Sequence, residues 1–207
     1  MTMRKILIAT TNPGKMRELS ELLDAKVEWV SLKDFPGLPE VVEDGETFAE
    51  NAAKKALGYA KATGLWTIAD DSGLCIDALG GAPGINSARF CGPKDRAENR
   101  HLIDTKNMEK VLQLLKDLPE EKRTARFVCA ICLAGPQKIL AQTQATWEGV
   151  IATAPIGTGG FGYDPIMYIP ELENSVGQIS APLKNQLSHR AKAIKLLKPH
   201  LSALLKA

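Results

Sequence analysis

The amino-acid sequence predicts an α/β fold in which helices flank a central mixed β-sheet. Strand-like and helix-like segments are interspersed along the chain, and no internal repeat, low-complexity tract or linker separates them. Of the 207 residues, 44% are hydrophobic and 24% are charged, which is close to the composition of an ordinary globular domain. A chain of this length buries about 70% of its unfolded surface, so it needs no disulfide or structural metal to fold. We therefore expect a single domain over residues 1–207.

The chain is expected to begin with a strand, a helix and a second strand. An apolar strand over residues 5–10 leads into a helix whose N-cap is Asn12. Pro13 then occupies the first helical position, where its missing N–H is no loss. Residues 27–32 form the next strand, and a loop rich in proline and glycine follows it.

A second helix and a buried strand follow this loop. The pattern Thr47-x-x-Glu50 is that of a capping box, and it opens an alanine-rich helix that ends near Gly64. Residues 65–69 form the buried strand, which is expected to stop at a turn over residues 70–73. This turn places two carboxylates at the end of an apolar strand.

The middle of the chain combines a loop with a long helix. Three glycines and a proline predict the loop at residues 80–84. The helix is expected over residues 94–118. Its apolar face should contain Val111, Leu112, Leu114 and Leu115.

The remaining elements are a hairpin, a short strand and a last helix. Residues 125–133 and 139–151 read as two strands joined by a short turn. After a glycine-rich loop, residues 165–169 form another strand. An amphipathic helix from about Ser188 ends the chain, and Pro199 should kink it.

Charge and hydropathy exclude several classes of protein. Twenty-six Lys and Arg residues against 24 Asp and Glu leave a net charge of +2, which is far from that of a strongly basic nucleic-acid binder. No apolar run approaches the length of a membrane-spanning helix, about 18 residues. The apolar run at residues 6–9 is also too short for a signal peptide. We expect a cytoplasmic protein with no nucleic-acid or membrane partner.

Cys129 and Cys132 form a C-x-x-C motif inside a strand-like apolar segment. Positions three apart in a strand face opposite sides of the sheet, and no second pair of ligands stands at metal spacing. We therefore expect core thiols, with no zinc site or redox centre.

The segment from Thr10 to Lys15 resembles a phosphate cradle. Free N–H groups at a helix start point at an anion, the helix dipole favours negative charge there, and Lys15 adds a cation. A Walker A loop is excluded, because Ala9 and Met16 stand where that motif requires a glycine and a hydroxyl. An ordinary helix start with a solvated lysine explains the same residues.

The adjacent carboxylates Asp70 and Asp71 are the strongest local signal. They repel each other unless a cation, a proton or hydrogen-bond donors compensate. Carboxylates of this kind suit Mg²⁺, with substrate phosphates and waters as further ligands. Glu43, in the acidic stretch before the second helix, is a candidate for another ligand. The alternative is that one aspartate only caps the turn.

Gly157, Gly159 and Gly162 match the G-x-G-x-x-G pattern of dinucleotide-binding folds. That pattern must lie between a strand and a helix, whereas here Pro155 precedes it and Pro165 follows it. A flexible loop that presents an aromatic and polar groups to a ligand is the favoured interpretation, and a simple tight turn is the alternative. The groups in question are Phe161, Tyr163 and Asp164.

Lys184, His189 and Arg190 gather hydrogen-bond donors near the start of the last helix. Cations are unfavourable at a helix N-terminus, so compensation of the helix dipole does not account for them. A solvated basic edge explains them equally well. Together with the helix start and the carboxylates, however, they suit a nucleoside triphosphate.

Motifs along nearly the whole chain resemble, in order and spacing, the inosine triphosphate pyrophosphatase family, also called Ham1-like or non-canonical purine NTP pyrophosphatases. The segments that carry the resemblance are Thr10–Lys15, Thr47–Ala52, Ile68–Leu74, Gly80–Gly84, Ser87–Phe90, Gly159–Pro165 and Ser188–Arg190.

The resemblance implies an elongated α/β fold with two lobes around an active-site cleft, and a homodimer. It also implies hydrolysis of ITP, dITP and XTP to the monophosphate and pyrophosphate with Mg²⁺ as cofactor, which clears damaged purine nucleotides from the pool. Asp71 would bind the metal and act as general base, with Glu43 as the second metal-site carboxylate, and Ser72 would contact the substrate.

The substrate contacts carried over from the family fall into two sets. The phosphates would be held by Thr10, Thr11, Asn12, Pro13, Gly14 and Lys15. The base and phosphates would also be contacted by Phe161, Gly162, Tyr163, Asp164, Lys184, His189 and Arg190. Thr11 departs from the family pattern, which often has glycine or serine there.

Two alternatives stay open at this stage. One is a related pyrophosphatase that acts on modified pyrimidine or canonical nucleotides and differs only in its base contacts. The other is a nucleotide-binding module without catalysis, which the paired aspartates disfavour because carboxylates near phosphates need a metal.

Overall fold

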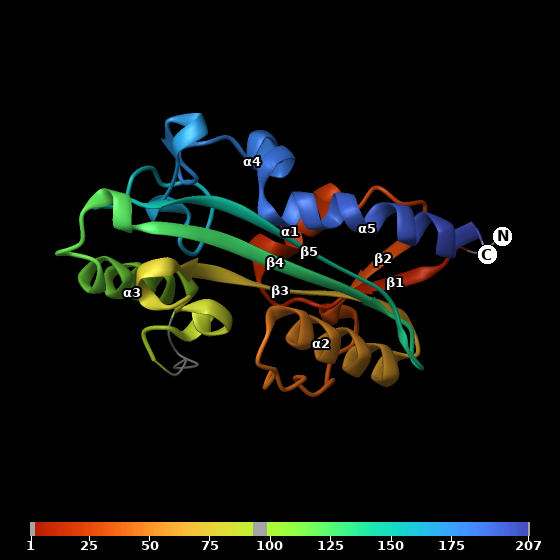
Figure 1. Ribbon diagram of the computed structural model, residues 1–207. Coiled ribbons are helices and arrows are strands. Elements are labelled where there is room, and N and C mark those ends of the chain that lie inside the picture. The colour runs from red at the N-terminus through yellow and green to blue at the C-terminus, as the bar shows by residue number, and fades with distance from the viewer. Residues whose placement is uncertain (1–2, 93–98, 207) are drawn as a thin grey trace. The chain divides into compact units, whose positions relative to one another are not determined.

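Figure 1 shows the computed structural model of the protein, which describes residues 3–92 and 99–206. The chain forms two compact units, each assembled from several segments. The first comprises Met1–Asp71, Cys129–Ala145 and Ser188–Ala207, and the second comprises Ser72–Val128 and Thr146–Leu187. Three strands contribute residues to both units. The predicted single domain over residues 1–207 stays a prediction.

The first unit contains parallel strands between helices. Its elements are β1 (Lys5–Ile8), α1 (Pro13–Leu22), β2 (Glu28–Ser31), α2 (Phe48–Thr63) and α5 (His189–Lys206), with parts of β3 (Trp66–Ile76), β4 (Thr124–Ala134) and β5 (Ile139–Ile151). Strand β1 pairs in parallel with β2 and β3, which places Ile6 opposite Trp29 on one side and Trp66 on the other. Helices α2 and α5 lie on opposite faces of these strands, and α1 packs against α5 (Figure 1).

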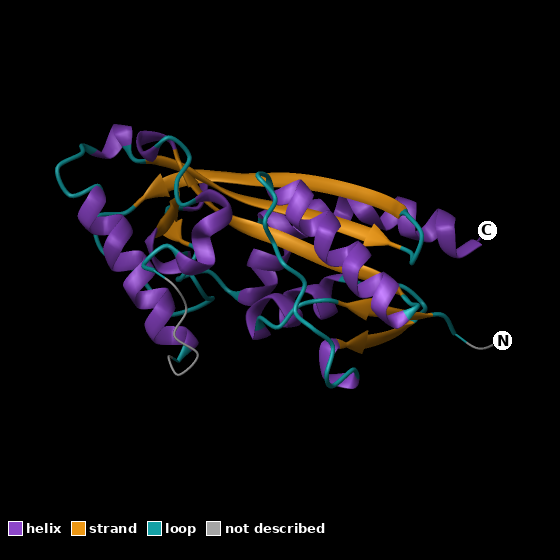
Figure 2. Cartoon of the chain, turned by 90° about the horizontal axis from the view of Figure 1, so that it is seen from below, coloured by secondary structure: helices purple, strands orange, loops and turns teal. Residues whose placement is uncertain are grey.

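The second unit contains antiparallel pairing. Its further elements are α3 (Arg100–Leu114), β6 (Met167–Ile169), β7 (Asn174–Ser175) and α4 (Ala181–Leu187). Strand β6 pairs antiparallel with β5 and with β7. Within the described residues, seven strands form one sheet in the order β2-β1-β3-β4-β5-β6-β7, and helices flank the strands (Figure 2). The predicted mixed sheet with flanking helices is confirmed.

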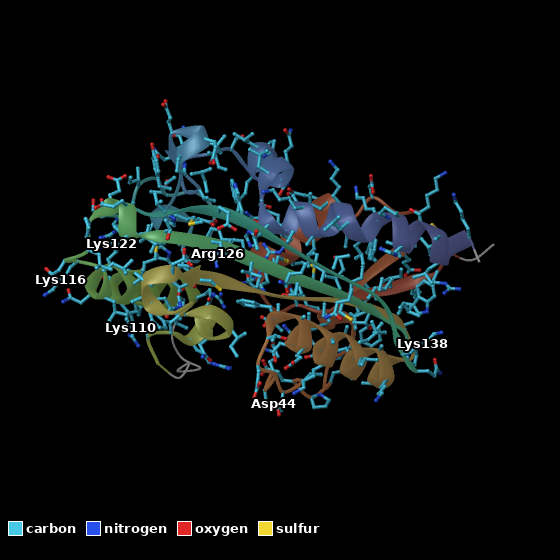
Figure 3. All side chains as sticks on the ribbon, viewed as in Figure 1. Asp44, Lys110, Lys116, Lys122, Arg126 and Lys138 are labelled. Carbon is cyan, nitrogen blue, oxygen red and sulfur yellow. The ribbon has the colours of Figure 1, made fainter. Side chains whose placement is uncertain are left out.

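Each unit has its own apolar core. In the first unit, side chains of β1, β3 and β4 meet those of α1 and α5; the cluster includes Ile6, Ile8, Leu19, Ile68, Ile131, Leu133, Ile194 and Leu197. In the second unit, the cluster includes Leu74, Ile76, Val111, Leu115, Phe127, Trp147, Ile151 and Ile166. Charged side chains such as Asp44, Lys116 and Lys138 are exposed on the surface (Figure 3). None of the helices within residues 3–92 and 99–206 has both the length and the apolar composition needed to cross a membrane.

Cys129 and Cys132 lie in the core, as predicted. Both side chains are fully buried and carry free thiols. Burial raises the pKa of each thiol to about 12, so neither is a thiolate near neutral pH.

The helix caps predicted from the sequence are confirmed. Asn12 caps α1 with Pro13 in the first turn, and the Thr47 hydroxyl accepts a hydrogen bond from the Glu50 N–H at 3.1 Å. Gly64 ends α2 in the left-handed conformation, with a φ of 73°. The second half of the capping box differs from expectation, because the Glu50 carboxylate accepts from the N–H of Glu46.

The predicted turn over residues 70–73 is wrong, because β3 continues without a break to Ile76. Leu74 and Ile76 beyond the supposed turn are fully buried, as expected for a strand. Glycine is needed at position 73 for a reason other than a turn. A Cβ there would overlap the Ser87 hydroxyl and lie 2.5 Å from the carbonyl oxygen of Gly84. Gly73 therefore permits a close approach between segments.

Other element boundaries also differ. The long helix ends at Leu114 rather than at residue 118, and its predicted start at residue 94 lies outside the described residues. Leu114 is 49% exposed, so it does not belong to the apolar face. Residues 164–166 form a 3₁₀ turn before the short strand β6, and helix α4, which holds Lys184, was not predicted.

Arg123 ties its own backbone segment to two others in the second unit. Its guanidinium donates to the carbonyl oxygens of Leu115, Ile151 and Ala152, each at 2.8 Å, and the residue is only 2% exposed. The Leu115 carbonyl lies at the end of α3, where a cation also complements the helix dipole.

We expect Arg123→Met to lower the free energy of unfolding by about 2–5 kcal/mol, because buried carbonyl oxygens lose their donors. Arg126→Met, three residues further along the chain on β4, is the matched control. Arg126 is 37% exposed, and its ion pairs with Asp77 and Glu148 are on the surface, so the loss should stay below about 1 kcal/mol. Chemical denaturation measures the free energy of unfolding of both variants. Equal losses of stability in the two would contradict this role for Arg123.

Candidate active site

The start of α1 holds a cation but not free amides. The Asn12 side chain accepts hydrogen bonds from the N–H groups of Gly14 at 2.9 Å and Lys15 at 3.3 Å. The N–H of Asn12 in turn donates to the Thr10 hydroxyl at 3.2 Å. The interpretation that these amides are free to bind an anion is therefore wrong for Gly14 and Lys15. The ammonium of Lys15 is a cation at this helix start, and its contact with phosphates stays a prediction.

Asp70 is the centre of a buried charge cluster in the first unit. Its carboxylate is 3.0 Å from the ammonium of Lys15 and 3.1 Å from the guanidinium of Arg190, and its side chain is fully buried. Burial alone would raise the pKa of Asp70, but Lys15, Arg190 and Lys55 hold it well below the usual range. Asp70 is therefore an anion whose charge is already compensated by the protein.

Asp71 has a different environment, although it is the next residue. Neighbouring residues of a strand point to opposite faces, so the two carboxyl groups diverge. Burial, together with the charges of Glu43 and Asp70, raises the pKa of Asp71 against the opposing effect of Lys15 and Lys55. Asp71 is thus the carboxylate more suited to accept a proton.

Lys55 connects these groups to Glu43. Its ammonium donates to the backbone carbonyl oxygen of Asp70 at 3.1 Å and pairs with the Glu43 carboxylate at 2.7 Å. The Lys55 side chain is 14% exposed. Burial would lower the pKa of Lys55, but Asp70, Glu43 and Asp71 raise it, so it stays a cation.

The donor set around Asp71 fits a magnesium ion. Asp71 and Glu43 supply hard oxygen donors, and the charge of Glu43 contributes to the raised pKa of Asp71. Within the described ranges, no group of three or more His, Cys, Asp or Glu forms a metal cage. A site with two carboxylates is what Mg²⁺ uses when substrate phosphates and water complete its coordination.

The start of α5 completes the cluster. Arg190 is 1% exposed, and its guanidinium pairs with Glu18 of α1 as well as with Asp70. His189 is 5% exposed. Burial opposes the charge of Arg190, but the carboxylates of Asp70 and Glu18 raise its pKa, so the guanidinium stays charged. The contact of Arg190 with a base stays a prediction, and the geometry shows a guanidinium engaged by two carboxylates.

A second group of predicted residues gathers in the second unit. The Lys184 ammonium lies 2.5 Å from the Asp164 carboxylate and 4.6 Å from the centre of the Phe161 ring. The same carboxylate accepts from the Phe161 N–H at 2.8 Å. The Tyr163 hydroxyl donates to the carbonyl oxygen of Ser87 at 2.8 Å.

The other predicted residues lie on β3, at the start of α1 and in the glycine-rich loop. Ser72 is half-buried on β3, and Thr11 and Pro13 are exposed at the start of α1. Gly162 has a φ of 64°, a conformation that favours glycine.

The sequence interpretation missed Lys55 and Glu18. Lys55 lies within α2 between the buried residues Ala52 and Ala56, so the helical period places it beside the buried face. Glu18 is three residues after Lys15, on the same side of α1, and is 8% exposed. The periodicity of each helix was the signal that could have found them.

A model of the Ham1 family matches residues 6–200. The chain belongs to the Ham1 family. A relative described as a dITP/XTP pyrophosphatase, from Desulforamulus reducens, is 49% identical over 193 residues, which cover 92% of each chain.

Solved structures of Ham1-family proteins have the same fold. A HAM1 protein from Coxiella burnetii matches 97% of this chain and 100% of its own, with a TM-score of 0.84 and 37% identity. A nucleoside-triphosphatase, also described as a dITP/XTP pyrophosphatase, from Mycobacterium abscessus matches 94% of this chain and 99% of its own, with a TM-score of 0.75 and 41% identity. The predicted family resemblance is confirmed.

Proposed function

We propose that this Ham1-family protein hydrolyses non-canonical purine nucleoside triphosphates, namely ITP, dITP and XTP, to the monophosphate and pyrophosphate. The observation that carries the proposal is the cluster in which Lys15 and Lys55 lie beside Asp70, Asp71 and Glu43. It combines cations for phosphates with a carboxylate suited to take a proton. The description of relatives as dITP/XTP pyrophosphatases supports this substrate class.

Asp71 acts as the general base in this proposal. Its pKa is raised by burial, which brings its affinity for a proton closer to that required near neutral pH. The carboxylate accepts the proton of the attacking water. Asp70 has no such role, because Lys15 and Arg190 compensate its charge and lower its pKa.

Asp71 and Glu43 would hold the magnesium ion, which when bound would neutralise phosphate charge and polarise the attacking water. Lys15 and Lys55 orient the triphosphate by attraction to its oxygens. Each cation already has a carboxylate partner, so both ammonium groups are held in place before substrate arrives.

Base recognition falls to Phe161 and Lys184 in this proposal. The ring stacks on a purine and adds affinity with little discrimination. The Lys184 ammonium, held beside the ring by Asp164, is a hydrogen-bond donor. A donor matches the oxygen at C6 of hypoxanthine and xanthine, whereas adenine has an amino donor there.

Release of pyrophosphate from ITP, XTP, dITP, GTP, ATP and dUTP, with and without Mg²⁺, tests the proposal. We expect metal-dependent turnover with a clear preference for the first three. A preference for a pyrimidine or canonical nucleotide would favour the related pyrophosphatase, and binding without turnover would favour a nucleotide-binding module.

We further propose a cytoplasmic homodimer, which rests on the family resemblance. Light scattering on the purified full-length chain gives the mass in solution. A mass near twice 22.4 kDa would support the dimer, and a monomer at micromolar concentration would contradict it.

Lys15→Ala is expected to weaken ITP binding by about 10- to 100-fold and IMP binding much less, because a charged hydrogen bond to the extra phosphates is lost. Added salt should narrow the difference. Calorimetric titration of both ligands measures it, with the exposed Arg17→Ala on the same helix as control. Equal losses for ITP and IMP would show that Lys15 does not contact the phosphates.

A further inference from the structure

Asp104 of α3 contacts the loop that presents Phe161. Its Oδ2 accepts a hydrogen bond from the N–H of Gly162 at 3.0 Å, and its Oδ1 accepts from the guanidinium of Arg100 at 3.1 Å. Asp104 is 8% exposed. A buried carboxylate therefore reaches from a helix to a backbone amide 58 positions further along the chain.

Two successive amides of this loop are held by two carboxylates. The N–H of Phe161 donates to Asp164 and the N–H of Gly162 donates to Asp104. Hydrogen bonds to a charged acceptor are stronger than those between neutral groups. The backbone on both sides of the Phe161 side chain is thereby fixed.

The loop depends on these bonds because its backbone is otherwise permissive. Gly160 and Gly162 have φ values of 75° and 64°. Glycine adopts many other conformations at little cost, so an unheld Gly162 amide would let the neighbouring aromatic change direction.

The same face of α3 is anchored to another segment of the unit. Asn107, three residues after Asp104, accepts from the Cys91 N–H at 2.7 Å and donates to the Ser87 carbonyl oxygen at 3.3 Å. Tyr163 donates to that carbonyl oxygen as well. Helix α3 is therefore a fixed support from which Asp104 holds the loop.

We propose that Asp104 is a positioning residue for base recognition, which orients the Phe161 ring by holding the Gly162 amide. This inference rests on the proposed function, in which Phe161 stacks on the purine. Asp104 itself touches no substrate. Its effect should appear in substrate affinity, because the residues assigned to the chemistry lie in the first unit.

Asp104→Ala should raise KM for ITP about tenfold and leave kcat within about twofold, since one charged hydrogen bond that positions the ring is lost. Asp104→Asn keeps an acceptor and should restore most of the affinity. An asparagine at position 104 has only one side-chain oxygen, for which the Gly162 N–H and the Arg100 guanidinium would compete. Asp104→Asn is therefore made both alone and together with Arg100→Gln. Arg100→Gln alone is the control, and it should resemble the wild type. If Asp104→Ala is too unstable to assay, Asp104→Leu removes the acceptor while keeping the volume.

A double-mutant cycle with Phe161→Ala separates positioning from general support. If Asp104 acts through the ring, Asp104→Ala should add little to the effect of Phe161→Ala on KM. Additive losses, an equal fall in kcat, or failure of Asp104→Asn to rescue in the Arg100→Gln background would overturn the proposal.

Amide exchange of Gly162 gives a readout that needs no turnover. We expect the Gly162 N–H to exchange faster in Asp104→Ala than in the wild type. The double variant Asp104→Asn with Arg100→Gln should exchange at about the rate of the wild type. Unchanged exchange in Asp104→Ala would overturn the inference. Absence of turnover by the wild type would instead contradict the proposed function and leave this exchange experiment to decide the role of Asp104.

Discussion

Asp71→Asn is expected to lower the rate of ITP hydrolysis by about 100- to 10,000-fold, the usual effect of losing a general base. An amide accepts no proton from water and is a weaker ligand for Mg²⁺ than a carboxylate. The fold should persist, because burial already disfavours the charged form of Asp71, as its raised pKa shows.

The measurement is ITP turnover across a Mg²⁺ titration, with thermal unfolding as the check on folding. Glu43→Gln should shift the Mg²⁺ requirement upward and recover activity at high metal, since only one ligand is lost. Asp44→Asn is the matched control beside it, because Asp44 is exposed and pairs with Lys54 in a surface ion pair. Turnover like that of the wild type in Asp71→Asn at saturating Mg²⁺ would rule out the assigned role.

Features that depend on near neighbours in the chain were predictable. The caps at Asn12 and Thr47 and the end of α2 at Gly64 follow from groups within a few residues, and the structure contains all three. The buried strands were also predictable, because short continuous apolar runs bounded by turn residues are typical of buried strands. The parallel pairing of β1 with β2 and β3 follows from the helices that connect these strands.

Misread elements show where local rules fail. The sequence Asp70 to Gly73 looks like a turn, yet β3 runs through it because two cations reach Asp70 from α1 and α5 and stabilise its charge inside the protein. The glycine serves the approach of Ser87. Neither cause can be recognised from adjacent residues.

The distinction between Asp70 and Asp71 also required the structure. From the sequence alone the two carboxylates were equivalent candidates for metal binding and proton transfer. Strand geometry sends them to opposite faces, and the surrounding charges then move their pKa values apart. The family resemblance had assigned the chemistry to Asp71, and the electrostatic environment supports the same choice.

Arg190 is where sequence and structure suggest different roles. A hydrogen-bond donor just inside the last helix suits an oxygen of a base. The pairing of Arg190 with Asp70 spans 120 positions, so it cannot be predicted from the residues near Arg190 in the sequence. A guanidinium that is 1% exposed between Glu18 and Asp70 has a structural task whatever else it does.

Arg190→Met is accordingly expected to lower the free energy of unfolding by about 3–5 kcal/mol at neutral pH, because two buried carboxylates lose their shared cation. Lys198→Met on the same helix is the control. Lys198 is 39% exposed and pairs with the exposed Asp24, so its loss should cost less than about 1 kcal/mol. Denaturant unfolding of the two variants and the wild type gives the comparison.

The pH dependence of this loss identifies its cause. The pKa of Asp70 is lowered in the folded protein, so its ionised form contributes stability above the ordinary carboxyl pKa, and that contribution is lost as the pH falls toward the folded value. Without Arg190, Asp70 should protonate at higher pH, and its neutral form no longer needs the missing cation. The difference in the free energy of unfolding between the wild type and Arg190→Met should therefore become smaller below about pH 5. If Arg190 serves only to read the base, Arg190→Met will instead keep the stability of the wild type at every pH and lose its preference for ITP over ATP.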